Sequence, residues 1–167
     1  MAIMIRPPYK IMESVNTNSI KIFTAGTIDQ CLVEPWADKV FEFFHNKYPY
    51  INNGITIINP RRTEWDSSWE QTYENPQFYQ QVNWELNGLE QSNFIIINIL
   101  PDSKSPITLL ELGLFAKSGN VLVCCPQGFY RKGNVDVVCE RYGVPIYNNL
   151  EELLVELNKR IIKQINK

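Results

Sequence analysis

"NFIIINIL", residues 93–100, reads as the clearest β-strand in the chain. Its apolar side chains occupy successive positions, so both faces of the strand must be covered, as in a central strand of a parallel sheet. A polar turn, "PDSKS" (101–105), separates this strand from an apolar helical segment. The stretch therefore predicts the middle of an α/β sheet, with one βα connection directly after it.

The same alternation of short apolar strands and helical periodicity extends outward in both directions. We expect further strands at 20–26, 54–60, 120–126 and 143–147, and helices at 33–48, 76–92, Pro106 to Gly119 and 149–165. Such βαβ units predict a doubly wound, flavodoxin-like sheet of about five parallel strands with helices on both faces. Residues 1–19 are expected to be an irregular N-terminal arm, and residues 20–167 a single domain.

Composition narrows the classes of function. The chain has 167 residues, with 16 Lys and Arg against 18 Asp and Glu, and this balance does not favour a nucleic-acid polymer as partner. His45 is the only histidine, and the four cysteines form no CxxC pair, so we expect buried free thiols and no metal site. No stretch approaches the roughly 20 apolar residues of a membrane helix. The start does not resemble a signal peptide, so we expect a cytoplasmic protein.

Two carboxylates stand in unusual surroundings. Glu111 lies inside "ITLLELGLFAK" (107–117), and burying a lone carboxylate costs several kcal/mol unless it is paired or hydrogen-bonded. Gly113 beside it leaves room for a ligand. Glu85 lies at the edge of the apolar stripe of the helix at 76–92. Either acid could simply reach solvent or a salt bridge. A pair of carboxylates with no histidine also suits chemistry at an anomeric carbon.

Ligands of open α/β sheets bind beyond the carboxyl ends of the strands, where this chain has long polar connections. Arg61 and Arg62 follow the second expected strand and could bind a phosphate or carboxylate, or be solvated. The loop "WDSSW" (65–69), with Trp65, Asp66 and Trp69, could stack on a flat ligand or fold onto the body. There is no GxGxxG or GxxxxGK[ST] motif, which leaves dinucleotide redox chemistry and P-loop chemistry without their main support.

The pattern "IFTAG…W…NPRR…W…WEL…FIIINI…SPITLLELG…VLVCCP…GNVDVV", over about residues 20–147, resembles the nucleoside 2-deoxyribosyltransferase-like proteins. They belong with the nucleoside deoxyribosyltransferases and 2′-deoxynucleotide N-glycosidases. The T-x-x-E-x-G element, here Thr108 to Gly113, is the most diagnostic part of the resemblance. It implies an enzyme without a cofactor that acts on the N-glycosidic bond of a 2′-deoxynucleoside.

The resemblance also implies roles for individual residues. Glu111 looks like the nucleophile that attacks C1′ of the deoxyribose and forms a glycosyl–enzyme ester. Glu85 stands where the family usually has an aspartate that holds and protonates the base. Asn134 matches an asparagine that enters the active site of a neighbouring subunit, which implies a homo-oligomer. The glycine turn around Gly26 to Gln30 would line the sugar and base pocket, and the predicted binding residues in and beside it are Thr24, Gly26 and Asp29.

The chain departs from the classical transferases at two places. Ser105 stands six positions before the nucleophile, where they usually carry an acid, and Asp102 lies three residues earlier. Both are kept as candidate substrate-binding residues. The classical tyrosine near the first strand is replaced by Phe23 and Thr24.

Three interpretations of the function remain open. The first is transfer of deoxyribose from a deoxynucleoside to a second free base. The near alternative is hydrolysis by an N-glycosidase, and Arg61, Arg62 and Lys104 would favour a 5′-monophosphate if they face the site. The third is a nucleotide-binding or sensing module without turnover. A flavodoxin-like electron carrier is disfavoured, because no Ser/Thr-rich phosphate loop follows the first strand.

Overall fold

The structure is a computed structural model that describes residues 2–11, 18–27, 35–48, 54–64, 66 and 68–166. Its elements in chain order are β1 (Ala2–Ile5), β2 (Ile20–Gly26), α1 (Trp36–Lys47), β3 (Ile55–Ile58), α2 (Pro76–Gln91), β4 (Phe94–Asn98), α3 (Pro106–Phe115), the 3₁₀ turn η1 (Ala116–Ser118), β5 (Val121–Cys124), α4 (Lys132–Tyr142), β6 (Ile146–Tyr147) and α5 (Leu150–Ile165). The strands form a six-stranded sheet in the order β1-β3-β2-β4-β5-β6. The pairs β1–β3, β2–β3, β4–β5 and β5–β6 are parallel, which confirms the predicted α/β class.

The five strands that the sequence predicts are β2 to β6. Without β1, their order across the sheet is β3-β2-β4-β5-β6, which is the 2-1-3-4-5 order of flavodoxin-like folds. The sixth strand, β1, falls among the residues that we expect to be irregular, so this expectation is wrong for residues 2–5. Only four residues form β1, too few for a clear period, and its parallel pairing with β3 makes it a strand.

The chain forms two compact units, and the boundary between them passes through β2. Unit 1 comprises Met1–Phe23 and Ala37–Asn93, and unit 2 comprises Thr24–Trp36 and Phe94–Lys167. Glu85 therefore belongs to unit 1 and Glu111 to unit 2.

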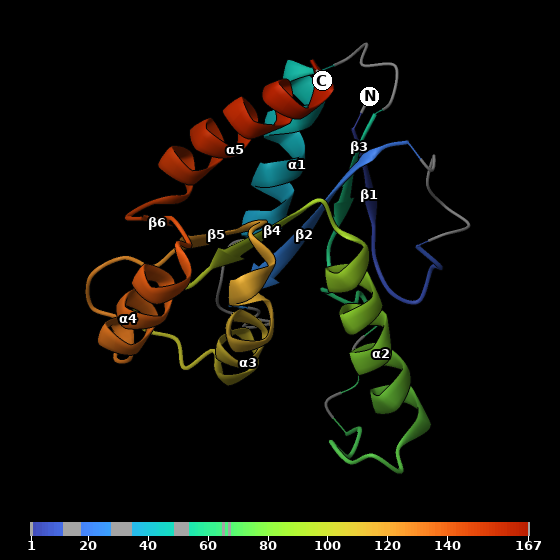
Figure 1. The fold of residues 1–167 in the computed structure, drawn as a ribbon. Helices are drawn as coiled ribbons and strands as arrows, with labels where there is room; N and C mark the ends of the chain where they lie inside the picture. The colour runs from blue at the N-terminus through green and yellow to red at the C-terminus, as the bar shows by residue number, and fades with distance from the viewer. Residues whose placement is uncertain are drawn as a thin grey trace. The chain divides into compact units, whose positions relative to one another are not determined.

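Unit 1 contains β1, β3, the start of β2, and most of α1 with all of α2 (Figure 1). The register places Ile5 and Phe23 on either side of Ile58, and all three side chains are buried. α2 approaches these strands closely through Gly88, where an added Cβ would lie 2.8 Å from the Phe23 ring. Arg6, just after β1, forms an ion pair with Asp38 in the first turn of α1. This ion pair links α1 to β1, the strand that the sequence pattern does not predict.

Unit 2 contains β4, β5 and β6 with the helices that connect them. All five residues of β4 are buried, as the doubly apolar pattern of "FIIIN" predicts. α3 and α4 lie together on one side of β4, β5 and β6, and α5 lies on the other side (Figure 1). The shared side of α3 and α4 follows from two successive right-handed crossovers in the same direction along the sheet.

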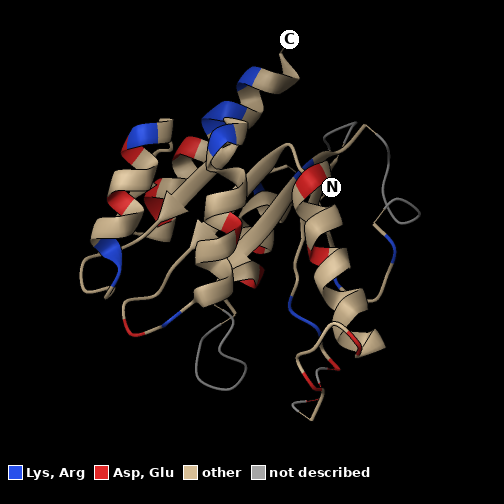
Figure 2. Cartoon of the chain, turned by 60° about the horizontal axis from the view of Figure 1, so that its bottom comes forward, with Lys and Arg blue, Asp and Glu red and all other residues tan. Residues whose placement is uncertain are grey.

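α4 is a second correction, because the pattern predicts no helix between the strands at 120–126 and 143–147. Val135 and Cys139 are the buried residues of this helix, so its apolar stripe is too thin to show a clear helical period. α5 is predicted almost to the residue, since Asn149 caps it by accepting a hydrogen bond from the Glu152 N–H at 2.8 Å. Figure 2 shows Lys and Arg collected near the C-terminal end of this helix, where they complement its dipole.

Three of the four cysteines fall among the described residues, and all three are free and buried, as predicted. They are Cys124, Cys125 and Cys139. Burial raises the pKa of Cys124 and of Cys139 to about 12, so these two thiols stay protonated at neutral pH and are not nucleophiles. Cys31 lies outside the described residues.

Candidate functional site

α3 turns its carboxylate inward and several large apolar side chains outward. Glu111 is 8% exposed, whereas Ile107, Leu110 and Leu114 are 57–59% exposed. Its buried residues are Thr108, Glu111 and Leu112, which the i, i+3, i+4 spacing puts on one face. When a helix is apolar on nearly all sides, its sequence does not show which face is buried. Here the inward face is the one that carries the acid.

A cluster of hydroxyl groups lies at the start of α3. Ser103 and Ser105 hydrogen-bond each other through Oγ at 2.8 Å, and Thr27 Oγ1 lies 2.9 and 2.7 Å from these two oxygens. Thr27 Oγ1 also accepts from the Leu100 N–H at 3.1 Å. Ser105 is the N-cap residue, but its side chain makes no capping bond. It adopts the left-handed conformation with φ 44°, which is uncommon for a residue other than glycine.

The end of β2 is held close to β4 within unit 2. Gly26 has φ +149°, and a Cβ there would lie 2.3 Å from the carbonyl oxygen of Asn98. The Thr27 N–H donates to this Asn98 oxygen at 3.0 Å, and Trp36 Nε1 donates to the Thr27 carbonyl at 3.1 Å. Thr24, one of the predicted pocket residues, is 1% exposed in the strand. Gly26 is thus required by packing.

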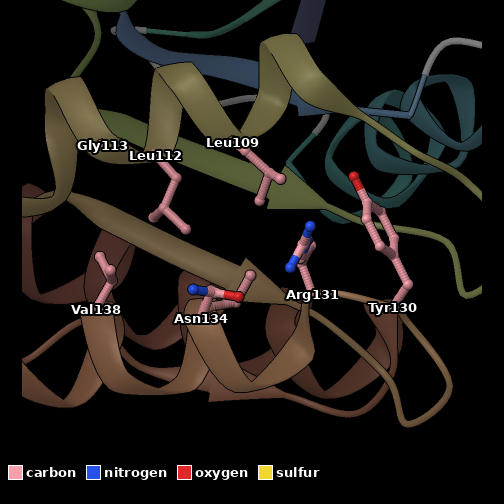
Figure 3. A pocket seen from close by; sticks show the side chains of 8 residues that line it. Leu109, Leu112, Gly113, Tyr130, Arg131, Asn134 and Val138 are labelled. Carbon is pink, nitrogen blue, oxygen red and sulfur yellow. The ribbon is translucent and has the colours of Figure 1, made fainter.

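A cavity of about 320 Å³ lies between α3 and the beginning of α4, within unit 2. It is lined by Leu109, Leu112, Gly113, Tyr130, Arg131, Asn134, Val135 and Val138. Figure 3 shows Leu109 and Leu112 extending from α3 toward α4, with Arg131 and Asn134 on the opposite wall. The structure therefore brings together two predicted site residues, Gly113 and Asn134. Glu111 is not among the lining residues.

Two consecutive arginines of unit 1 differ in their surroundings. The Arg61 N–H donates to Asn59 Oδ1 at 3.0 Å, and the residue is partly buried. The Arg62 guanidinium lies over the Trp69 ring, 5.0 Å from its centroid, and Nη1 donates to Gln81 Oε1 at 3.4 Å. Arg62 Nε is buried and has no hydrogen-bond acceptor among the described residues. Trp69 thus contacts a protein side chain through the face of its ring.

Glu85 belongs to the same network in unit 1. Gln81, 4% exposed, donates from Nε2 to Glu85 Oε1 at 2.9 Å and to the Pro60 carbonyl at 3.0 Å. Burial raises the pKa of Glu85 from 4.5 to about 6, and the hydrogen bond from Gln81 opposes this by favouring the charged form. Raised carboxyl pKa values are found at sites where an acid must hold a proton near neutral pH.

Two other predicted site residues, Asp66 and Asp102, take no part in the hydrogen bonds of these clusters. Asp66 is exposed and accepts hydrogen bonds from the Ser68 N–H at 2.8 Å and hydroxyl at 2.6 Å, which lower the pKa of Asp66. Such bonds close a local turn. Asp102 is exposed and makes no hydrogen bond with a described residue. Asp29 and Trp65 lie outside the described residues.

Sequence reasoning misses several residues of these clusters. Tyr130, Arg131 and Val138 line the cavity beside α4, a helix that the pattern does not predict. Gln81 is buried on α2 although a polar residue at this position reads as exposed. Its place four residues before Glu85, on the same helix face, is the signal that could have found it.

The described residues contain neither a cluster of metal ligands nor a helix that could span a membrane. Within the described ranges, no group of three or more His, Cys, Asp or Glu side chains could hold a metal ion. None of the helices described here combines the length and apolar character that crossing a bilayer requires.

The fold and the site together define the class of this protein. It is an α/β protein with a flavodoxin-like sheet and a buried glutamate on the helix after β4. The family model described as "Nucleoside 2-deoxyribosyltransferase like" matches residues 19–129, and the chain belongs to this family. A solved structure titled "Crystal structure of conserved protein from Enterococcus faecalis V583" has the same fold, with a TM-score of 0.58 and 13% identity. The match covers 85% of this chain and 99% of that one. A comparison with curated proteins gave no match.

Proposed function

We propose that the protein is an enzyme that cleaves the N-glycosidic bond of a 2′-deoxynucleoside and transfers the deoxyribose to another nucleobase. The observation that carries this proposal is Glu111, a carboxylate 8% exposed on α3, in the T-x-x-E-x-G element of the family-matched region. A carboxylate can act as the nucleophile at an anomeric carbon, and its burial would shield the resulting ester from water.

In the first step the Glu111 carboxylate attacks C1′ of the deoxyribose. The bond between C1′ and the base nitrogen breaks, its electron pair stays with the base, and the base takes a proton from Glu85. In the second step a nitrogen of the incoming base attacks C1′, the ester to Glu111 breaks, and the proton of that base passes to Glu85. Two displacements on the same carbon give net retention of configuration.

The surroundings of Glu85 support its role as the acid. Its pKa of about 6 leaves a usable protonated fraction at neutral pH, and acid–base catalysts work best with a pKa near the working pH. A carboxyl group with the ordinary pKa of about 4.3 would hold far less of the proton.

A 5′-monophosphate N-glycosidase is the second candidate, favoured by one observation. Arg62 carries a buried Nε with no acceptor among the described residues, although its Nη1 is bonded to Gln81. A substrate phosphate is a natural acceptor for a guanidinium group. In this reaction water replaces the second base, so the two candidates differ in what attacks the ester.

We also propose that the enzyme is a homo-oligomer in which Asn134 contributes to a neighbouring site. Asn134 is exposed, and the outward face of α3 presents Ile107, Leu110 and Leu114 at 57–59% exposure. Contiguous apolar surface of this kind is typical of protein–protein contacts. Replacing Leu110 by Lys is expected to lower the molar mass in solution, measured by light scattering.

The test of the reaction is base release and exchange, followed by chromatography. Wild type, Glu111→Gln and the control Glu140→Gln, an exposed glutamate of α4, are incubated with deoxynucleosides and their 5′-monophosphates, with and without a second base. Exchange in wild type and control, absent in Glu111→Gln, supports the transferase. Free base without exchange supports the hydrolase. Binding without release from any substrate supports a sensing module and contradicts both enzymes.

A further inference from the structure

We propose that Gln81 is a positioning residue for Glu85: it holds one carboxyl oxygen and thereby assigns the transferred proton to the other. This inference rests on the proposed role of Glu85 as the acid. Gln81 does not touch the substrate in this account, and it acts through Glu85.

The amide of Gln81 uses both of its ends. Nε2 donates to Glu85 Oε1 at 2.9 Å and to the Pro60 carbonyl oxygen at 3.0 Å, and Oε1 accepts from Arg62 Nη1 at 3.4 Å. The residue is 4% exposed, so water does not replace these partners freely. A buried amide whose donors and acceptor are all occupied is held in one position.

The partners of Gln81 also determine which way its amide points. The Pro60 carbonyl can only accept a hydrogen bond, and the Arg62 guanidinium can only donate one. A flipped amide would place its oxygen against the oxygens of Pro60 and Glu85, and its NH₂ group against Arg62. All three contacts would be repulsive. Arg62 and Pro60 therefore keep the N–H groups of Gln81 directed at Glu85.

This orientation assigns the proton of Glu85. Since Gln81 Nε2 can only donate, Glu85 Oε1 accepts whether the carboxyl group is charged or neutral. The proton of the neutral form must then lie on Oε2. A general acid needs a suitable pKa, and its proton must also point toward the group that receives it, because proton transfer depends first on geometry.

In the part of the chain that the structure describes, no charged group close to Glu85 competes with the hydrogen bond that Gln81 donates to it. On α2 the residues one turn away are Gln81, Val82, Gly88 and Leu89, and none is ionisable. Among the described residues no cation forms an ion pair with Glu85, and Arg62, from the segment after β3, reaches it only through Gln81. Removing the donor is therefore expected to change the proton affinity of Glu85 directly.

The first measurement is a carboxyl titration of the free protein by NMR, with glutamate labelled at Cδ and Glu85→Gln used for assignment. Gln81→Met keeps the length of the side chain but removes the donor. Its Glu85 pKa is expected to rise by about one pH unit, because a hydrogen bond to a charged group favours the charged form. Gln80→Met is the matched control, since Gln80 is exposed and its side chain makes no hydrogen bond with a described residue; no shift is expected.

The second measurement is the pH profile of kcat/KM for base release. The alkaline limb of Gln81→Met is expected to move upward with the Glu85 pKa, and the maximum to fall about tenfold through loss of orientation. Gln81→Leu, which removes the same donor with a differently shaped side chain, is expected to shift the pKa in the same direction. It provides the test if Gln81→Met does not fold.

The outcomes separate this inference from the proposed function. An unchanged Glu85 pKa in folded Gln81→Met or Gln81→Leu overturns the role of Gln81. A shifted pKa in a protein that releases no base from any substrate supports the hydrogen-bond assignment and overturns the proposed function. A shifted pKa with an unmoved alkaline limb shows that Glu85 is not the acid, which also overturns the positioning role in catalysis.

Discussion

The two glutamates of the proposed mechanism lie in different surroundings, since Glu111 is buried and Glu85 is half-buried. Glu111 lies on the inward face of α3 with Thr108 and Leu112, whereas Ile107, Leu110 and Leu114 point outward. Glu85 lies in a polar network, where Gln81 donates to it. The comparison shows that burial alone does not define a function, since a nucleophile must be charged and an acid must keep its proton.

The largest effect is expected from the nucleophile. Glu111→Gln preserves size and removes the negative charge, so base release should fall by a factor of about 1,000 or more. Initial rates measured by chromatography give this factor, with Glu140→Gln as control. A loss of less than about tenfold in folded protein would remove Glu111 from the covalent step.

A smaller effect is expected from the acid. Glu85→Gln can still accept the hydrogen bond from Gln81 but has no proton to give, and acid catalysis is worth roughly 100-fold or more. The alkaline limb near pH 6 should disappear from the profile of kcat/KM, because the group that loses its proton there is gone. Glu90→Gln, an exposed change on the same helix, should retain the limb.

Glu85 should also make stability depend on pH. Its pKa is raised from 4.5 to about 6 in the folded protein, so the folded state holds the proton more tightly than the unfolded chain. The stabilisation is fully present below pH 4.5 and is lost as the pH rises through 6. Glu85→Gln should reduce the fall in unfolding free energy between pH 4 and pH 7 by about 2 kcal/mol. Urea unfolding at both pH values measures it, and identical pH dependence in the two proteins would contradict a raised pKa.

The smallest effect concerns the start of α3. Ser105→Ala loses the hydroxyl bonds to Thr27 and Ser103 and keeps the left-handed backbone, so it should cost about 1 kcal/mol. Ser105→Gly loses the same bonds, but glycine adopts this conformation without strain. Thermal unfolding should therefore rank wild type above Gly and Gly above Ala, and a less stable Gly variant would show that φ 44° is not strained in this chain.

Much of the fold follows from local patterns, and the site follows from them only in part. The run of apolar residues in β4 and the Ser105–Pro106 start of α3 identify those elements directly. β1 is defined by its pairing with β3, and α4 buries only Val135 and Cys139, so neither leaves a strong period in the sequence.

The site residues show the same division between local and tertiary information. An isolated acid in an apolar helix indicates Glu111, because its cost is visible in the sequence. The network around Glu85 depends on Pro60 and Arg62, some twenty residues earlier in the chain, meeting Gln81 on α2. Sequence spacing along one helix shows that Gln81 and Glu85 share a face, but it does not show what faces them.

The most direct test of the account is to trap the glycosyl–enzyme. Wild type, Glu111→Gln and Glu140→Gln are mixed with a deoxynucleoside that supports base release, quenched in acid within one turnover, and examined by intact mass and peptide mass spectrometry. The account predicts one added deoxyribosyl group in wild type and in Glu140→Gln, located on the peptide that carries Glu111, and none in Glu111→Gln. An adduct on another residue, or one that persists in Glu111→Gln, would contradict it.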